Sequence, residues 1–291
     1  MKLSVCSASL PDHDPESAVM VVRQAGYAGI EWRVASNAFD LNREPHFFDN
    51  NRCTVPPVLA RLESIADLCR EADLEIIGLS PYVDAGDVAA VDAAMSLANA
   101  IGVGWIRLRA PWREDGALPS QFAQASEFLS SVEELARRHG VRGLIELHQR
   151  SICPSATAAY RLISSFDPRH VGVIYDVGNL IVEGYEDHMM AAQLLGDYLG
   201  HVHLKNAAYV RPKHGGVWRP RWTALDDGVL NIPELLRALD SVGYDQWLSI
   251  EDFSTARPPA ETLRFDATLM QRFLQDRPAA PDLRSMQRVS G

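Results

Sequence analysis

The sequence predicts a single (β/α)8 barrel, and three observations carry the prediction. Short runs rich in Val, Ile and Leu alternate eight times with amphipathic helical patterns along 291 residues. No change in composition divides the chain into halves, and one such barrel typically needs about 250 residues. Ligand-type polar residues close several of the apolar runs, which is where barrels of this class place their reactive groups.

The strand-like runs are six to eight residues long and rich in β-branched side chains, as expected of buried parallel strands. They cover residues 3–8, 28–34, 74–80, 103–110, 141–148, 171–176, 199–205 and 246–252. An open, doubly wound sheet is the alternative arrangement of such units. It would place a Gly-rich phosphate-binding turn after the first strand, and LSVCSASLPDHD contains none. The closed barrel is therefore preferred.

Between the runs, apolar residues recur at helical spacing, as Leu62, Ile65 and Cys69 do. The predicted helices cover residues 16–26, 56–72, 85–101, 119–139, 155–165, 187–197, 231–242 and 259–276. Gly140 is expected to end the fourth, because glycine accepts the left-handed backbone that follows many helices. We expect loops at 36–54 and 206–228. We assign residues 1–276 to the barrel and 277–291 to a C-terminal tail.

Charge and composition exclude some classes of function. The net charge is −10 and no Lys/Arg run stands out, so we expect no nucleic-acid partner. No apolar run approaches the roughly 20 residues that span a bilayer, so we expect a cytoplasmic protein without a membrane partner. The four cysteines form no CxxC pair and are expected to be reduced packing residues.

Four polar residues stand near the ends of the last four strands of the predicted barrel: Glu146 in GLIELHQ, Asp176 in VGVIYDVGN, His203 in HVHLKN and Glu251 in WLSIEDF. Side chains alternate in direction along a strand, so residues flanked by buried Ile, Leu or Val point into the barrel. A lone strand-end Glu or inward His is usually solvated or structural. Four such residues at the same end of the barrel favour a metal site instead, because burying three carboxylates without a cation is very costly. Three carboxylates and one imidazole suit Mn²⁺, Mg²⁺, Co²⁺ or Zn²⁺.

The motifs IELH, YDVGN, HVHLKNA and DGVLNIPELLRALDSVGYDQWLSIEDF resemble those of the xylose isomerase-like TIM barrels. More narrowly, the chain is similar to the sugar phosphate isomerase/epimerase superfamily, with its tagatose-type 3-epimerases and inosose dehydratases. The resemblance implies one divalent metal, Mn²⁺ first, on Glu146, Asp176, His203 and Glu251. It also implies that Glu146 and Glu251 carry the proton during epimerisation. A metal chelated by neighbouring carbonyl and hydroxyl oxygens acidifies the intervening C–H and stabilises an enediolate.

The chain departs from the family it resembles at two points. Sugar epimerases often carry His three residues after the strand-six Asp, where this chain has Asn179, which can bind a hydroxyl but cannot act as an acid. The related AP endonucleases hold three metals with additional histidines. The corresponding segments here, LSPY, RAPW, DVGN and WTALDD, contain none, which disfavours a DNA-repair function.

A second set of residues is expected to contact the substrate: Glu31, Arg109, His148, Asn179 and Lys205. For His148 and Lys205, a role in supporting the metal ligands is the alternative. An internal Glu–Arg network filling the barrel is the alternative for Glu31 and Arg109. Trp112, Trp218 and Trp222 are candidates for an apolar wall at the barrel mouth or for a subunit contact.

The leading hypothesis is a metal-dependent isomerase or epimerase acting on a small hydroxy-ketone, a sugar or a cyclitol. The first rival is a lyase or dehydratase that uses the same site on a keto-sugar, an inosose or a keto-glycoside, with His148 or Lys205 as the additional acid. A rival of another class is a non-catalytic barrel that binds a sugar or a partner. The resemblance suggests a homodimer, and the sequence leaves open the exact substrate and whether it is phosphorylated.

Overall fold

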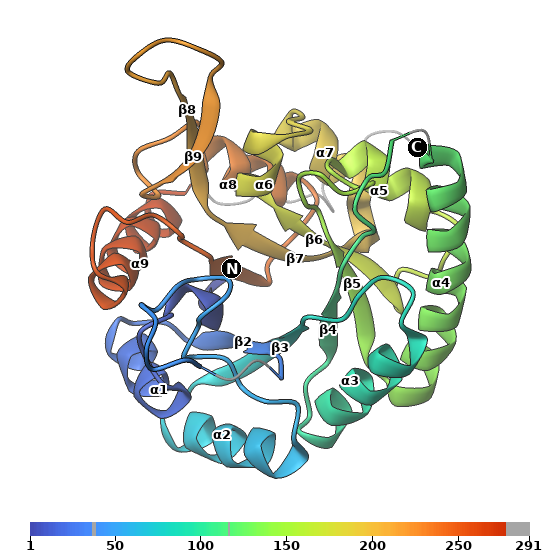
Figure 1. The fold of residues 1–291 in the computed structure, drawn as a ribbon, viewed down its shortest axis with the longest axis horizontal. Helices are drawn as coiled ribbons and strands as arrows, with labels where there is room; N and C mark the ends of the chain where they lie inside the picture. Colours follow the sequence, from blue (N-terminus) through green and yellow to red (C-terminus); the bar gives the residue numbers. More distant parts are fainter. Residues whose placement is uncertain (37–38, 116, 278–291) are drawn as a thin grey trace, which may run out of the picture.

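Eight parallel strands close into a barrel in the computed structural model, which describes residues 1–36, 39–115 and 117–277. The strands are β1 (Lys2–Cys6), β2 (Gly29–Val34), β3 (Glu75–Pro81), β4 (Trp105–Leu108), β5 (Arg142–Glu146), β6 (Val171–Asp176), β7 (Leu199–Leu204) and β10 (Trp247–Ile250). Their order around the barrel follows the chain, and β10 pairs with β1 to close it. Figure 1 shows the helices arranged outside this ring. The predicted (β/α)8 TIM barrel is confirmed.

The principal helices lie close to their predicted positions. They are α1 (Pro15–Gln24), α2 (Leu59–Glu71), α3 (Val88–Ala100), α4 (Leu118–His139), α5 (Ala156–Ile163), α7 (His188–Leu195), α8 (Ile232–Ser241) and α9 (Pro259–Gln275). Local signals fix several ends: the side chain of Asn231 accepts a hydrogen bond from the Glu234 N–H at the start of α8, and Gly140 ends α4 at a φ of 67°. Each helix buries an apolar stripe against the barrel, such as Leu235 and Leu239 of α8.

The strands are buried on both faces, which is why their sequences read as nearly continuous apolar runs. In β5, Ile145 belongs to the apolar layer beneath the helices, whereas Glu146 turns toward His203 inside the barrel. Close packing constrains this wall: a Cβ added at Gly78 would lie 2.1 Å from the indole of Trp105. Because side chains alternate in direction along each strand, the apolar ones pack beneath the helices and the polar ones point into the barrel toward the site.

The sequence did not predict a hairpin, a short helix and two 3-10 turns. The expected loop at 206–228 contains an antiparallel hairpin, β8 (Asn206–Val210) and β9 (Arg219–Thr223), so that prediction is wrong in part. The hairpin extends beyond the rim of the barrel at the upper left of Figure 1. A six-residue helix, α6 (Val177–Val182), follows β6 directly. In addition, short 3-10 turns lie at Ser7–Ser9 and Gly196–Tyr198.

The proposed division between the barrel and a tail at 277–291 remains a prediction, because residues 278–291 lie outside the described part of the chain. Within the described residues, no helix combines the length and the apolar character needed to cross a bilayer.

Candidate metal centre and active site

The four residues predicted to bind a metal converge at the carboxyl ends of the strands. Glu146 ends β5, Asp176 ends β6, His203 lies in β7 and Glu251 directly follows β10. The strand register brings Asp176 opposite His203, and Ser249 of β10 opposite His203 from the other side. One potential ligand atom from each of the four residues lies within 4.8 Å of the others.

His203 lies at the centre of this cluster. Its Nδ1 is 3.5 Å from Glu146 Oε1, 3.7 Å from Asp176 Oδ2 and 3.6 Å from Glu251 Oε2. All four side chains are buried, and Nδ1 has no hydrogen-bond partner among the described residues. A buried ring nitrogen without a partner, facing three carboxylate oxygens, is the arrangement a divalent cation would satisfy.

The other face of the imidazole is held by Glu31. His203 Nε2 lies 2.8 Å from Glu31 Oε2, His201 Nε2 lies 3.4 Å from the same oxygen, and Ser80 Oγ donates to Glu31 Oε1. Burial opposes ionisation of Glu31, but the two histidines outweigh it and hold its pKa far below the usual value. A carboxylate on the far nitrogen orients a ligating histidine and increases its basicity. Glu31 was predicted to bind substrate; it lies beneath His203 and does not line the pocket.

Two basic side chains balance part of the negative charge. Lys205 Nζ is 2.5 Å from Asp176 Oδ2 and also contacts Glu251, and Arg107 Nη1 donates to Glu146 Oε2 at 2.6 Å. Burial would lower the pKa of His203, yet the surrounding carboxylates, Glu31 first, raise it well above the usual value. The three carboxylates of the cluster outnumber these two basic side chains, and its hard oxygen donors and single imidazole fit Mn²⁺, Mg²⁺, Co²⁺ or Zn²⁺.

The two glutamates of the cluster have different surroundings. Burial raises the pKa of Glu251, and the neighbouring Lys205 and His203 offset only part of the rise. Burial acts in the same direction on Glu146, but Arg107, together with the nearby His203, His148 and Lys205, outweighs it and brings the pKa of Glu146 well below its usual value. Surroundings that shift the pKa values of two carboxyl groups in opposite directions are typical of acid–base pairs.

Asn179 supports Asp176. Its Nδ2 donates to Asp176 Oδ2 at 2.7 Å and to the Leu147 carbonyl at 3.0 Å, while its backbone N–H donates to Asp176 Oδ1 at 2.9 Å. Asp176 is thereby the N-cap of α6 as well as a potential ligand. Asn179 was predicted to contact substrate; in the structure it is buried behind the carboxylate and does not line the pocket.

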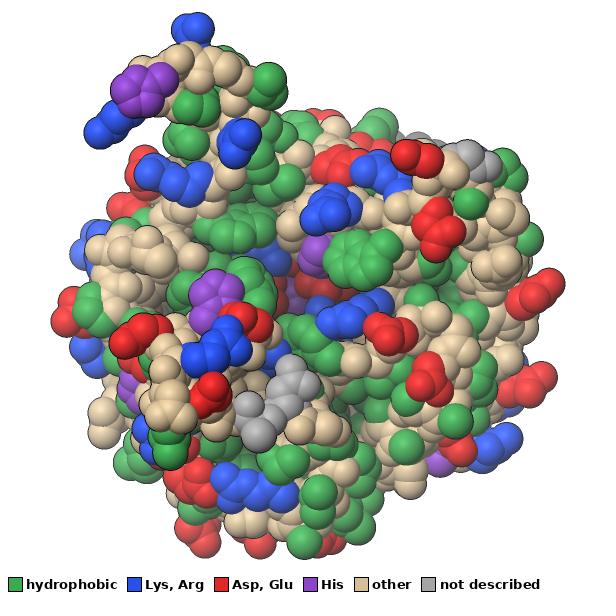
Figure 2. Space-filling model, in the orientation of Figure 1, with side chains coloured by type: hydrophobic (Ala, Val, Ile, Leu, Met, Phe, Trp, Pro, Cys, Tyr) green, Lys and Arg blue, Asp and Glu red, His purple; other side chains and the backbone are tan. Residues whose placement is uncertain are grey.

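A pocket of about 390 Å³ opens above the cluster. Glu146 and Glu251 form part of its floor, and the predicted substrate residues Arg109, His148 and Lys205 line it. Figure 2 shows acidic, basic and histidine side chains gathered in a hollow at the centre of this face. The volume lies in the range of small-molecule sites.

The sequence did not reveal the role of Tyr82, which follows β3. The guanidinium carbons of Arg33, Arg107 and Arg109 lie 4.3, 4.6 and 4.7 Å from the centroid of its ring. Arg33 also donates to the Phe47 and Phe48 carbonyls, which ties the 36–54 segment to the pocket wall. Such cation–π contacts hold three like charges around one aromatic ring. Alternation of side chains along the strands was the available sequence signal, because it points Arg33, Arg107 and Arg109 into the barrel.

Of the three loop tryptophans, Trp112 lines the pocket. Trp222 in β9 lies near Phe253, with Lys205 Nζ 5.3 Å from its ring. Trp218 is 56% exposed on the hairpin and does not line the pocket.

Comparison with known proteins is consistent with this geometry. The model of a family described as "Xylose isomerase-like TIM barrel" matches residues 19–273. An inosose dehydratase of Geobacillus thermodenitrificans is 26% identical over 157 residues, which cover 50% of this chain and 50% of the relative. The match thus spans about half the length of that curated relative.

Two solved structures illustrate the similarity in fold. A 3-keto-D-glucoside 4-epimerase from E. coli is 19% identical with a TM-score of 0.70, over 94% of this chain and 99% of that one. A protein titled IOLI, solved with a bound zinc atom, is 14% identical with a TM-score of 0.74, over 96% and 100% of the two chains.

Proposed function

Because the chain belongs to the xylose isomerase-like TIM barrel family, we propose that it is a metal-dependent isomerase or epimerase of a sugar or cyclitol. The reaction removes and returns the proton on a carbon beside the substrate carbonyl. One observation carries the proposal: two buried glutamates, Glu146 and Glu251, lie beside a histidine nitrogen that faces three carboxylates and has no hydrogen-bond partner in the part of the chain that the structure describes. The candidate proton-transfer groups and the candidate cation site therefore lie together at the floor of one pocket.

A divalent cation at this cluster would polarise the substrate carbonyl and stabilise negative charge on its oxygens. Glu146, kept ionised by Arg107, takes the proton from the carbon. Glu251, whose pKa is raised by burial, returns a proton. For a change of configuration the two carboxylates must act on opposite faces of the planar intermediate.

The remaining polar lining positions the substrate. Arg109, His148 and Lys205 present donors to its carbonyl and hydroxyl oxygens. His148 is fixed by a contact of 2.7 Å between its Nδ1 and the Gln149 carbonyl, which leaves Nε2 for the pocket. Phe48 and Phe253 line the same pocket and limit the access of water to the reacting carbon. We propose Mn²⁺ as the bound ion, a homodimer as the assembly and the cytoplasm as the location.

A dehydratase is the second candidate, and the position of Lys205 favours it. Lys205 Nζ contacts Glu251 and lines the pocket, so an ammonium group is available beside the carboxylate pair. Glu146 would take the proton beside the carbonyl, the electron pair would form the C=C bond, and hydroxide would leave the next carbon with a proton from Lys205, as water. The curated relative is named an inosose dehydratase, which agrees with this outcome.

Proton exchange in D₂O tests the proposal. Purified protein with Mn²⁺ is incubated with a panel of ketoses, inososes and keto-glycosides, and substrates and products are followed by NMR and mass spectrometry. We expect deuterium beside the carbonyl of at least one class, with an epimer or a dehydrated ketone as product. E146Q and E251Q should each lose exchange while retaining the fold. If the wild type exchanges no deuterium into any class beyond the metal-only blank, the proposal is overturned.

A further inference from the structure

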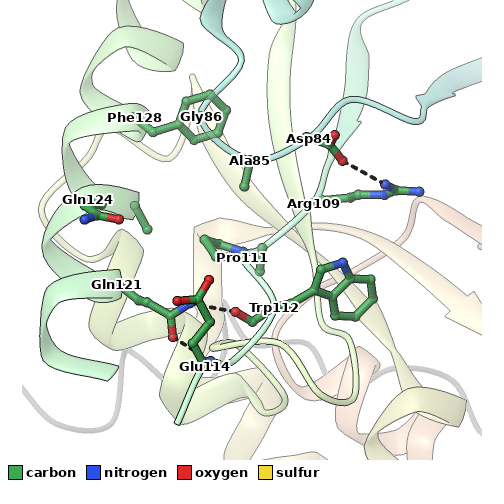
Figure 3. A pocket seen from close by; sticks show the side chains of 12 residues that line it. Asp84, Ala85, Gly86, Arg109, Pro111, Trp112, Glu114, Gln121, Gln124 and Phe128 are labelled. Carbon is green, nitrogen blue, oxygen red and sulfur yellow. Dashed lines mark hydrogen bonds and ion pairs between the residues drawn. The ribbon is translucent and has the colours of Figure 1, made fainter. Parts of the chain in front are cut away.

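A second pocket of about 340 Å³ opens beside the first, between the start of α4 and the loops after β3 and β4. Figure 3 shows its walls, in which Phe128 and Pro111 offer apolar surfaces and Gln124 and Glu114 offer polar groups. The proposed reaction does not use this outer pocket. Its volume lies at the lower end of the range for small-molecule sites.

The outer pocket adjoins the site pocket through shared residues. Arg109, Ala110 and Trp112 line both cavities. Ala110 has almost no side chain, and Arg109 reaches across to Asp84 in an ion pair of 3.2 Å, with the Asp84 side chain 88% exposed. The two cavities thus share one wall, in which the small Ala110 lies between Arg109 and Trp112 in the sequence. A ligand larger than one ring can therefore extend from the first pocket into the second.

Trp112 is held as a platform between the two pockets. Trp112 as a residue is 51% exposed, whereas its backbone is fixed by the buried Gln121, whose Nε2 donates to the Trp112 carbonyl at 2.7 Å. A β-bridge to Ser151 holds the same segment, and the ring of His148 lies edge-on at 5.0 Å. A large aromatic face on a fixed backbone offers contact area at low entropic cost, and its π surface accepts the C–H groups of a sugar or aromatic ring.

The charges of the outer pocket favour a neutral ligand. Among its described lining residues, Arg109 is the one cation, and it is paired with Asp84; Glu114 adds a further carboxylate. A phosphate or carboxylate would meet these acids without a free cluster of donors. A neutral ring is compatible with the amide of Gln124, the carboxylates and the aromatic faces.

We infer that the outer pocket binds the second, neutral ring of a glycoside whose keto-sugar ring lies over the Glu146–Glu251 pair. The inference rests on the proposed function, because it assigns the substrate of that same site to the glycosides rather than to free ketoses or inososes. Trp112 would then be a specificity-determining residue: contacts to the remote ring help to orient the reacting ring.

Binding and turnover together test the inference. Mn²⁺-loaded protein is titrated calorimetrically with phenyl β-D-glucopyranoside and with D-glucose, and kcat/KM is measured for the 3-keto derivatives of both. We expect the glucoside to be preferred by at least about 10-fold in both measurements. W112A should reduce the preference by at least about fivefold, with a larger loss in the values for the glucoside than in those for the monosaccharide, because Trp112 also lines the first pocket. Q124A, an exposed change on α4 that cannot disturb the core, should reduce it to a smaller extent.

W218A is the matched control, because Trp218 is similarly exposed but lies on the hairpin and lines neither pocket. It should retain the full preference. Equal affinity of the wild type for glucoside and glucose would overturn the inference even if keto-sugars are turned over, and so would a W112A variant that loses both ligands alike. Absence of turnover with an intact binding preference would instead count against the proposed function alone.

Discussion

Replacing Glu31 by Gln is expected to weaken metal binding without removing a metal ligand. Glu31 Oε2 lies 2.8 Å from His203 Nε2, and both side chains are fully buried. Gln fills the same volume and can still accept a hydrogen bond through its amide oxygen, but it carries no charge. The variant therefore removes the electrostatic support of the imidazole while preserving the packing around it.

The expected loss follows from that contact. Charge-assisted hydrogen bonds are roughly twice as strong as neutral ones, and changes to the partners of ligating histidines typically cost 10–100-fold in metal affinity or activity. That range is about 1.4–2.8 kcal/mol. We expect the effect in the dissociation constant for Mn²⁺, with little change in KM at saturating metal, because Glu31 does not line the pocket.

Isothermal titration with a competing chelator measures the dissociation constant, and thermal unfolding with and without Mn²⁺ checks that the variant is folded. Glu75→Gln is the control, because Glu75 lies at the start of β3, is exposed and pairs with Lys2. Unchanged Mn²⁺ affinity in E31Q, or a loss confined to KM, would refute the assignment of Glu31 as the support of His203.

Three further predictions test other parts of the structure. Lys205→Met should suppress elimination but only slow deuterium exchange, seen as the product ratio by NMR; equal loss of both would contradict a role as acid for the leaving group. Asp266 is buried without a hydrogen-bond partner among the described residues, and burial and Asp252 raise its pKa to about 8, so the folded state holds a proton that the unfolded state releases. The melting temperature of the wild type should therefore fall as the pH rises from about 4 to 8. That of Asp266→Asn should fall less over the same pH range, because the amide does not titrate. Gly78→Ala should cost about 1–3 kcal/mol in urea unfolding because its Cβ meets Trp105, whereas Gly104→Ala, with open space around it, should be neutral.

The fold was predictable because one physical rule acts along every strand. Apolar runs separated by helical patterns define the units, and alternation within a run fixes which side chains point inward. The positions of Glu146 and His203 inside the barrel follow from their Ile, Leu and Val neighbours. The meeting of residues distant in sequence follows from closure of the barrel alone.

Other features depend on contacts that no local pattern encodes. The hairpin was missed because Pro220 lies within β9 and a Gly pair interrupts the connection, and proline normally argues against a strand. Parity placed Glu31 and Lys205 inside the barrel, but only the structure shows that one reaches His203 and the other Asp176. Asn179 looked free for substrate because sequence cannot show that its amide is taken up by Asp176. Helix α6 has only six residues, which is too short to show a helical period in the sequence. Asp176, its N-cap, was the one local signal of a helix start.

The most direct test of the account is the manganese content and position in the purified protein. We predict one Mn²⁺ per chain by mass spectrometry after dialysis, with its anomalous diffraction peak among Glu146, Asp176, His203 and Glu251, and no retained metal in His203→Ala. A folded wild-type protein that binds no stoichiometric divalent ion, or that holds it elsewhere, would contradict the account.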